Sequence, residues 1–146
     1  MRTKTLCHFF LLLLLCTATP FQAQTPLKAR DVFRQMPDSI LPYLTENNRL
    51  DMVDFMDSRM KARVQNQFDG YSEMLSLTDD SLTIQMSSVQ RLTLRLLTAE
   101  TAVDGSRQLI CLERMIGKPA EQTQTKRSYY SVLWRKLEKE DIDLVK

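Results

Sequence analysis

The chain has 146 residues, of which 43% are hydrophobic, and its formal net charge is +2. The length and composition suit one compact domain, and the absence of repeats and low-complexity tracts excludes a repeat or fibrous protein. Arg2 and Lys4 are the only charged residues before residue 24, so the chain beyond that point is formally neutral. A neutral exported chain is a poor candidate for a protein that binds nucleic acid or any other polyanion.

The first 23 residues have the composition of a secretory signal peptide. Two basic residues precede an apolar run around Leu11–Leu15, which is too short to span a bilayer comfortably. Pro20 then interrupts any helix, and Ala23 offers a cleavage site. We therefore expect residues 1–23 to be removed and the mature chain to be periplasmic or secreted.

Two alternatives concern the processing of this segment. Cleavage after Ala18 would place the small residue Cys16 at the minus-three position. Cys16 could also receive lipid and anchor an outer-membrane lipoprotein, although Leu15 is larger than the residue such signals prefer. We expect a soluble exported chain without a lipid anchor.

Cysteine and histidine usage excludes several kinds of site. Beyond residue 23, Cys111 is the only cysteine and no histidine remains, because His8 lies in the signal segment. An intramolecular disulfide is therefore impossible in the mature chain. Histidine-ligated zinc and catalysis by Ser-His or Cys-His pairs are excluded as well.

Two helices are predicted ahead of the strands. Residues Ala29–Gln35 favour a short helix that ends before Pro37. Residues Thr45–Ala62 favour a long helix capped by Thr45 or Asn48, with an apolar stripe suited to covering a sheet. The stripe comprises Leu50, Val53, Met56 and Met60, and it is widened by Met52, Phe55 and Arg59. The intervening segment, residues 37–44, is apolar enough to lie against the core.

Residues Ser81–Leu97 predict a β-hairpin at the centre of an antiparallel sheet. Apolar and polar side chains alternate strictly along both halves, which is the period of a strand with one buried face. Folding about Val89 pairs Met86 with Leu92, Ile84 with Leu94, and Leu82 with Leu96. All six side chains then share one face, and Ser, Thr, Gln and Arg occupy the other.

Three further strands are predicted, at Tyr71–Leu77, Gln108–Ile116 and Lys126–Trp134. A turn at Asp79-Asp80 leads into the central hairpin, and Asp104-Gly105 is typical of a tight hairpin turn. The charged tail from Arg135 is expected to be frayed or helical. The predicted fold of residues 24–146 is α+β, with N-terminal helices on an antiparallel meander of about five strands.

The residues from Met36 to Phe55, MPDSILPYLTENNRLDMVDF, resemble the opening motif of a family of secreted Bacteroidales proteins called domain of unknown function 3256. The resemblance continues through RLTLRLL, ICLERMIGKP and the segment from Tyr129 to Trp134. It implies a bacterial envelope protein with an α+β fold, and it implies no activity. Relatives continue beyond the tryptophan, so we expect that a C-terminal segment is lacking here.

Asp51, Asp54 and Asp57 are the best candidates for a metal or carboxylate site. They are three residues apart on the predicted helix, where they could bind a hard cation such as calcium or magnesium. The alternative is a solvated helix face on which Asp57 pairs with Lys61. We favour the solvated face, so no metal and no cofactor is predicted.

Other chemically interesting residues have simpler interpretations. Cys111 lies in an apolar strand, which indicates a buried thiol and not a nucleophile. A Ser–Lys dyad would have to come from Lys118, Lys126, Ser128 and Ser131, whose spacing indicates none. The basic and aromatic residues Lys126, Arg127, Tyr129, Tyr130 and Trp134 could bind a sugar, but filling the sheet's edge and core explains the aromatic ones.

We therefore predict a non-enzymatic binding or interaction domain of the bacterial envelope, with no catalytic residues. The alternative is a carboxylate- or metal-dependent enzyme that uses Asp51 and Asp54. Expected partners are an unknown envelope protein or a second copy of the chain, because Gln108–Ile116 carries apolar residues toward both faces of a sheet that one long helix cannot cover.

Overall fold

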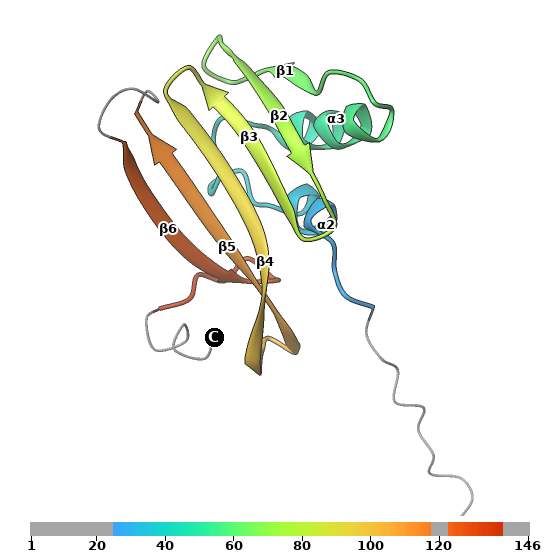
Figure 1. Ribbon diagram of the computed structural model, residues 1–146, viewed down its shortest axis with the longest axis vertical. Coiled ribbons are helices and arrows are strands. Elements are labelled where there is room, and N and C mark those ends of the chain that lie inside the picture. Colours follow the sequence, from blue (N-terminus) through green and yellow to red (C-terminus); the bar gives the residue numbers. More distant parts are fainter. Residues whose placement is uncertain (1–24, 118–122, 139–146) are drawn as a thin grey trace, which may run out of the picture.

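The computed structural model describes residues 25–117 and 123–138. Two helices, α2 (Ala29–Arg34) and α3 (Glu46–Asp57), precede six strands. The strands are β1 (Arg63–Gln65), β2 (Tyr71–Leu77), β3 (Ser81–Ser87), β4 (Gln90–Val103), β5 (Ser106–Ile116) and β6 (Gln124–Ser131). They form one antiparallel sheet in chain order, with both helices on the same side (Figure 1). The predicted α+β meander is confirmed, and the predicted signal peptide lies outside the described residues.

The helices divide the sheet into an inner face, which they cover, and an outer face on the opposite side. The central strands supply the middle of the inner face through Leu82, Ile84, Leu92 and Leu94, each 0% exposed. Against them pack buried residues of both helices, namely Ala29, Val32, Phe33, Met52 and Val53. Within the described residues, no helix is long and apolar enough to cross a membrane.

Helix α3 begins as predicted and ends earlier. The Thr45 hydroxyl accepts a hydrogen bond from the Asn48 backbone, and the Asn48 side chain accepts one from the Thr45 backbone. This reciprocal pair is a capping box. Arg59 has a left-handed φ of 56°, so the helix stops at Asp57 and not at Ala62. The following residues form β1, a strand of only 3 residues that the sequence pattern did not indicate.

The central hairpin has the predicted face and a different register. Ile84 lies opposite Leu92, and Leu82 lies opposite Leu94. The observed register is therefore shifted by two residues from the predicted one. The turn consists of Ser88 and Val89. The register shifts between Gln85 and Ser87, so Met86 has no direct partner on β4. A shift of two residues leaves each side chain on the same face, so the predicted core residues were still correct.

Strands β4 and β5 are longer than expected, and β5 is better covered. Asp104 and Gly105 form the tight β4–β5 turn with φ of 50° and 77°, as predicted. At this end the hairpin twists away from the other strands (Figure 1). A second small core forms there on the outer face, from Ala99, Val103, Leu109 and Leu137. Leu109 is 0% and Cys111 8% exposed, so the expectation that this side of β5 lacked cover was wrong.

The chain after β6 folds back on the sheet. Trp134 was predicted to end a strand, but β6 ends at Ser131 and Trp134 lies in a turn with a φ of 62°. Its indole Nε1 donates to the Val32 carbonyl at 3.0 Å, which fixes this turn to α2. The Leu137 backbone N–H then donates to the Tyr129 carbonyl at 2.9 Å. As far as Leu137 the tail is therefore neither frayed nor helical, because its apolar side chain completes the second core.

Candidate functional site

The outer face carries polar and charged side chains in rows that run across the strands. Residues that are direct partners in an antiparallel sheet point to the same side. The longest row crosses all six strands, through Arg63, Glu73, Gln85, Arg91, Met115 and Thr125. The next rows contain Thr83, Thr93, Glu113 and Arg127, and then Ser81, Arg95, Cys111 and Tyr129. Among the described residues, no helix covers these rows.

Two adjoining depressions hollow this surface along the longest row. The first has a volume of about 400 Å³ and is lined by Gln85, Ser88, Arg91, Met115 and Gly117. The second has a volume of about 330 Å³ and is lined by Arg63, Tyr71, Glu73, Leu75, Gln85, Ser87 and Ser88. Because they share Gln85 and Ser88, they form one shallow groove across the strands, here called the outer-face groove. Its size and openness suit part of an extended ligand better than an enclosed small molecule.

The side chains in the groove are held in place by polar contacts. The Gln85 amide nitrogen donates to the Ser87 carbonyl at 2.7 Å, which directs the amide oxygen toward Arg91. That oxygen accepts a hydrogen bond from Arg91 Nε at 3.1 Å. At the other end, the Arg63 guanidinium lies 4.3 Å from the centre of the Tyr71 ring. Both arginines are therefore oriented, and both remain exposed.

Both glutamates on this face already have partners. Glu73 lies 3.3 Å from Lys61 Nζ, and Glu113 accepts a hydrogen bond from Arg127 Nε at 2.6 Å. The Glu113 carboxylate raises the pKa of the Arg127 guanidinium. Arg91 and Arg95 have no ion pair within the part of the chain that the structure describes. The outer face therefore carries an excess of positive charge.

Cys111 is buried beneath this surface. Burial is the main cause of a raised thiol pKa, and Glu113 raises it further, while Arg127, Arg95 and a hydrogen bond from Tyr129 act in the opposite direction. A thiol with a raised pKa is a weak nucleophile at neutral pH. The prediction that Cys111 is a buried thiol is confirmed.

The aspartates proposed for a metal site point to different partners. Asp54 accepts a hydrogen bond from Arg34, and Asp57 accepts two from Arg30, each at 2.8 Å. Asp51 is exposed on the same helix. The expected Asp57–Lys61 pair is not formed, because α3 ends before Lys61 and that lysine reaches Glu73 on β2. No three carboxylate, cysteine or histidine side chains of the described residues lie close enough to hold a metal ion.

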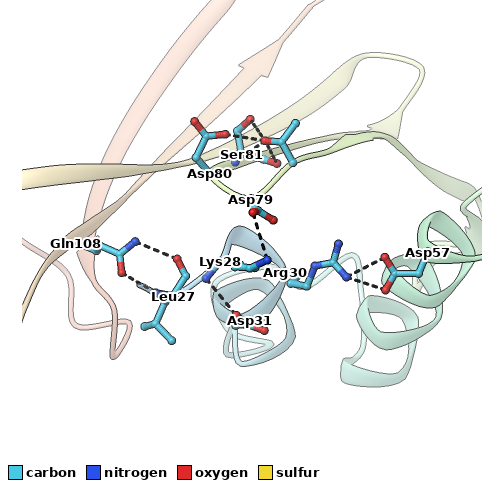
Figure 2. A network of polar contacts seen from close by, with 10 residues as sticks. Leu27, Lys28, Arg30, Asp31, Asp57, Asp79, Asp80, Ser81 and Gln108 are labelled. Carbon is cyan, nitrogen blue, oxygen red and sulfur yellow. Dashed lines mark hydrogen bonds and ion pairs between the residues drawn. The ribbon is translucent and has the colours of Figure 1, made fainter. Parts of the chain in front are cut away.

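Figure 2 shows that the Arg30–Asp57 pair belongs to a set of polar contacts that connect α2 to its surroundings. The Gln108 side chain bonds both backbone groups of Leu27, accepting at 2.8 Å and donating at 2.9 Å. Lys28 Nζ lies 3.2 Å from an Asp79 oxygen in the β2–β3 turn, while Arg30 reaches α3. The network connects α2 to the sheet and to α3. Its charges therefore have a structural explanation.

The remaining sequence candidates do not assemble into a site. Trp134 and Tyr130 are each 8% exposed and belong to the inner core, so neither presents a ring to a sugar. Ser131 lies on the opposite face of β6 from Lys126, and Ser128 lies on the same face without a hydrogen bond to it. Lys118 lies outside the described residues. Two other rings are exposed among the described residues, Phe68 at 61% and Tyr71 at 57%. The sequence pattern identified Tyr71 only as the start of a strand.

The fold and surface define an α+β meander sheet with helices on one face and an open, positively charged groove on the other. The chain belongs to the family described as "Protein of unknown function (DUF3256)", which matches residues 20–145. The resemblance seen in the sequence is thereby confirmed. No curated protein matches the chain.

One solved structure supports the fold. It is described as the structure of a domain of an uncharacterized protein from Porphyromonas gingivalis W83, and it superposes with a TM-score of 0.61 at 21% sequence identity. The match covers 80% of this chain and 56% of that one, so the chain spans a little over half of the solved structure. At this identity the likeness concerns the fold alone.

Proposed function

We propose that this protein is a non-enzymatic binding domain of the bacterial envelope, and that it binds its ligand on the outer face of the sheet. One observation carries the proposal. The outer face presents oriented side chains, among them Arg91 and Gln85, in a groove that none of the described elements covers. An antiparallel sheet whose core is supplied by one face can leave the other face in contact with solvent, where its side chains are available to a ligand.

Three observations support a role without catalysis. The chain after residue 23 has no histidine, which removes the commonest general base. The Cys111 thiol is buried. Asp51 and Asp54 are both exposed on α3, and Asp54 is paired with Arg34, which is not the sheltered carboxylate pair that a carboxylate-dependent enzyme needs.

Affinity capture with two matched variants tests this proposal. Tagged protein purified after export is incubated with an envelope extract, and the bound material is analysed for protein and for carbohydrate. Thr93→Tyr adds bulk at the centre of the outer face, and Asn47→Tyr adds the same ring on the exposed surface of α3. A specific ligand should bind the wild type and Asn47→Tyr and be lost with Thr93→Tyr. Recovery of no specific ligand, or equal recovery with Thr93→Tyr, would contradict it.

Export is part of the same proposal, with support from the basic start, the apolar run and Ala23. Mass spectrometry of the exported protein should give a chain that begins near Gln24 and carries no lipid. A diacylated species that begins at Cys16 would instead assign the protein to a membrane surface.

A further inference from the structure

The distribution of charge differs between the two sides of the molecule. On the helix side, ion pairs satisfy most of the arginines and several aspartates. These pairs are Arg30–Asp57 and Arg34–Asp54 at 2.8 Å, and Arg49–Asp38 at 2.6 Å. The chain after residue 23 is formally neutral. On the outer face, Arg63, Arg91 and Arg95 have no ion pair among the described residues, so this face carries uncompensated positive charge. A local field of this kind attracts anions even when the net charge is zero.

We infer that the ligand of the outer face is an acidic polysaccharide, with Arg91 and Arg95 as its main anion contacts; this deepens the proposed function and rests on it. The two arginines are four residues apart on one strand and point to the same side. Along a strand this separation is about 13 Å. One small anion cannot reach both, whereas a chain with repeated carboxylate or sulfate groups can.

The side chains between the arginines suit sugar hydroxyl groups. Thr83 and Thr93 form one cross-strand pair between the two arginine rows, and Gln85 lies beside Arg91. Hydroxyl and amide groups both donate and accept hydrogen bonds, as sugar hydroxyls do. At the end of the groove, the exposed Tyr71 ring offers an apolar face of the kind on which a sugar ring stacks.

An acidic peptide strand fits this surface less well. Extended peptides bind sheets mainly by adding to an edge, where unpaired backbone groups are free. The backbone groups of β3 and β4 are already paired with neighbouring strands on both sides. The outer face can therefore offer a ligand side chains only, which favours a ligand recognised through its own hydroxyl and acidic groups.

Affinity electrophoresis in gels that contain a polymer tests the inference directly. The polymers are polygalacturonate, dextran sulfate and neutral dextran, and the protein is the exported chain. Arg91→Gln combined with Arg95→Gln removes two charges from the outer face. The matched control, Arg59→Gln with Lys126→Gln, removes two exposed charges elsewhere. Circular dichroism checks that both variants are folded.

We expect both acidic polymers, and not dextran, to retard the wild type, with less retardation as salt rises. The Arg91–Arg95 double variant should raise the dissociation constant about tenfold, and the control should change it by less than about twofold. Three results would each overturn the inference: no retardation by either acidic polymer, equal retardation by dextran, or an equal loss in the control.

A separate arm distinguishes an acidic lipid surface from a polysaccharide. Vesicles of phosphatidylcholine with phosphatidylglycerol are sedimented with the wild type and with the double variant. If the protein co-sediments with these vesicles only when Arg91 and Arg95 are present, and neither acidic polymer retards it, the ligand of the outer face is an acidic lipid surface and not a polysaccharide. If neither acidic polymer retards the protein, but affinity capture yields a ligand whose binding is lost in Thr93→Tyr, the acidic-polysaccharide inference is wrong and the proposed function still stands. Failure of that capture experiment would remove the proposed function itself.

Discussion

The two faces of the sheet use the same strands for different purposes. Leu82, Ile84, Leu92 and Leu94 on the inner face are each 0% exposed. The residues between them on β3 and β4, such as Thr83 and Arg95, point to the outer face and remain partly or fully exposed. One alternating pattern therefore specifies both the core and the candidate binding surface. Because stability resides mainly on one face, the other is free to carry charge and hydrogen-bonding groups.

The largest expected effect lies on the inner face, at Leu94. Leu94→Ala should lower the free energy of unfolding by about 2–5 kcal/mol, because it removes fully buried carbon atoms and leaves a cavity. Thr93→Ser, its neighbour on the outer face, should cost far less. Urea denaturation of both variants measures the difference. Equal losses would show that the outer face is covered as tightly as the inner one.

The second core offers an intermediate case on the outer face. Leu137 is 3% exposed and packs with Ala99, Val103 and Leu109. Leu137→Ala should lower the free energy of unfolding by about 2 kcal/mol, since this cluster is small and lies at the end of the sheet. Leu133→Ala, at a residue that is 71% exposed, is the matched control and should change little. If the two variants are equally stable, this end of the outer face is not part of the cooperative core.

Asn66 is a polar residue that continues the inner face beyond β1. Its amide nitrogen donates to Ser72 and Met86, and its oxygen accepts from the backbone of Phe68 and Gly70. Asn66→Ala removes the acceptor of the Phe68 and Gly70 N–H groups, whereas Ser72 and Met86 keep the hydrogen bond between them, and it should cost about 1–2 kcal/mol. Gln65→Ala, exposed on the outer side of the same strand, should cost less than Asn66→Ala in thermal unfolding. The reverse order would mean that the side-chain bonds of Asn66 do not stabilise the loop.

The faces of the central strands could be predicted from the sequence, because a period of two depends only on neighbouring residues. The register could not, since it depends on a two-residue turn and an irregularity near Met86 that no local pattern shows. Strand β1 escaped prediction because 3 residues are too few to establish a period. No sequence pattern indicated that Arg49 is buried, yet it is 3% exposed and donates to Asp38 and to the Leu44 carbonyl.

The candidate binding surface was harder to predict than the fold. A formal charge of zero after residue 23 argued against an anionic ligand. That argument treats charge as evenly spread, whereas ion pairing depends on which residues meet in three dimensions. The pairs Arg30–Asp57 and Arg127–Glu113 join residues 27 and 14 positions apart. Only the folded chain reveals that such pairing leaves Arg91 and Arg95 without acidic partners among the described residues.

The smallest expected effect concerns the pH dependence of the covered end of the outer face. Asp104 accepts hydrogen bonds from Arg135 Nε, at 3.0 Å to its nearer oxygen. Hydrogen bonds from Arg135 and then Ser131 lower the pKa of the Asp104 carboxyl below its ordinary value. A lowered pKa in the folded state means that the ionised carboxylate stabilises the fold. This contribution is present above the ordinary pKa and is lost as the pH falls through the lowered one.

Asp104→Asn should therefore slightly lower the melting temperature near neutral pH, and acidification below about pH 4 should lower it less than in the wild type. Asparagine suits the left-handed φ of 50° at this position, so the turn itself should persist. Asp69→Asn, at another left-handed position with φ of 56°, controls for the change of residue type. If Asp104→Asn lost as much stability in acid as the wild type, the Asp104–Arg135 pair would not stabilise the packing of the β4–β5 turn on the segment after β6. The second core would then depend on its apolar contacts alone.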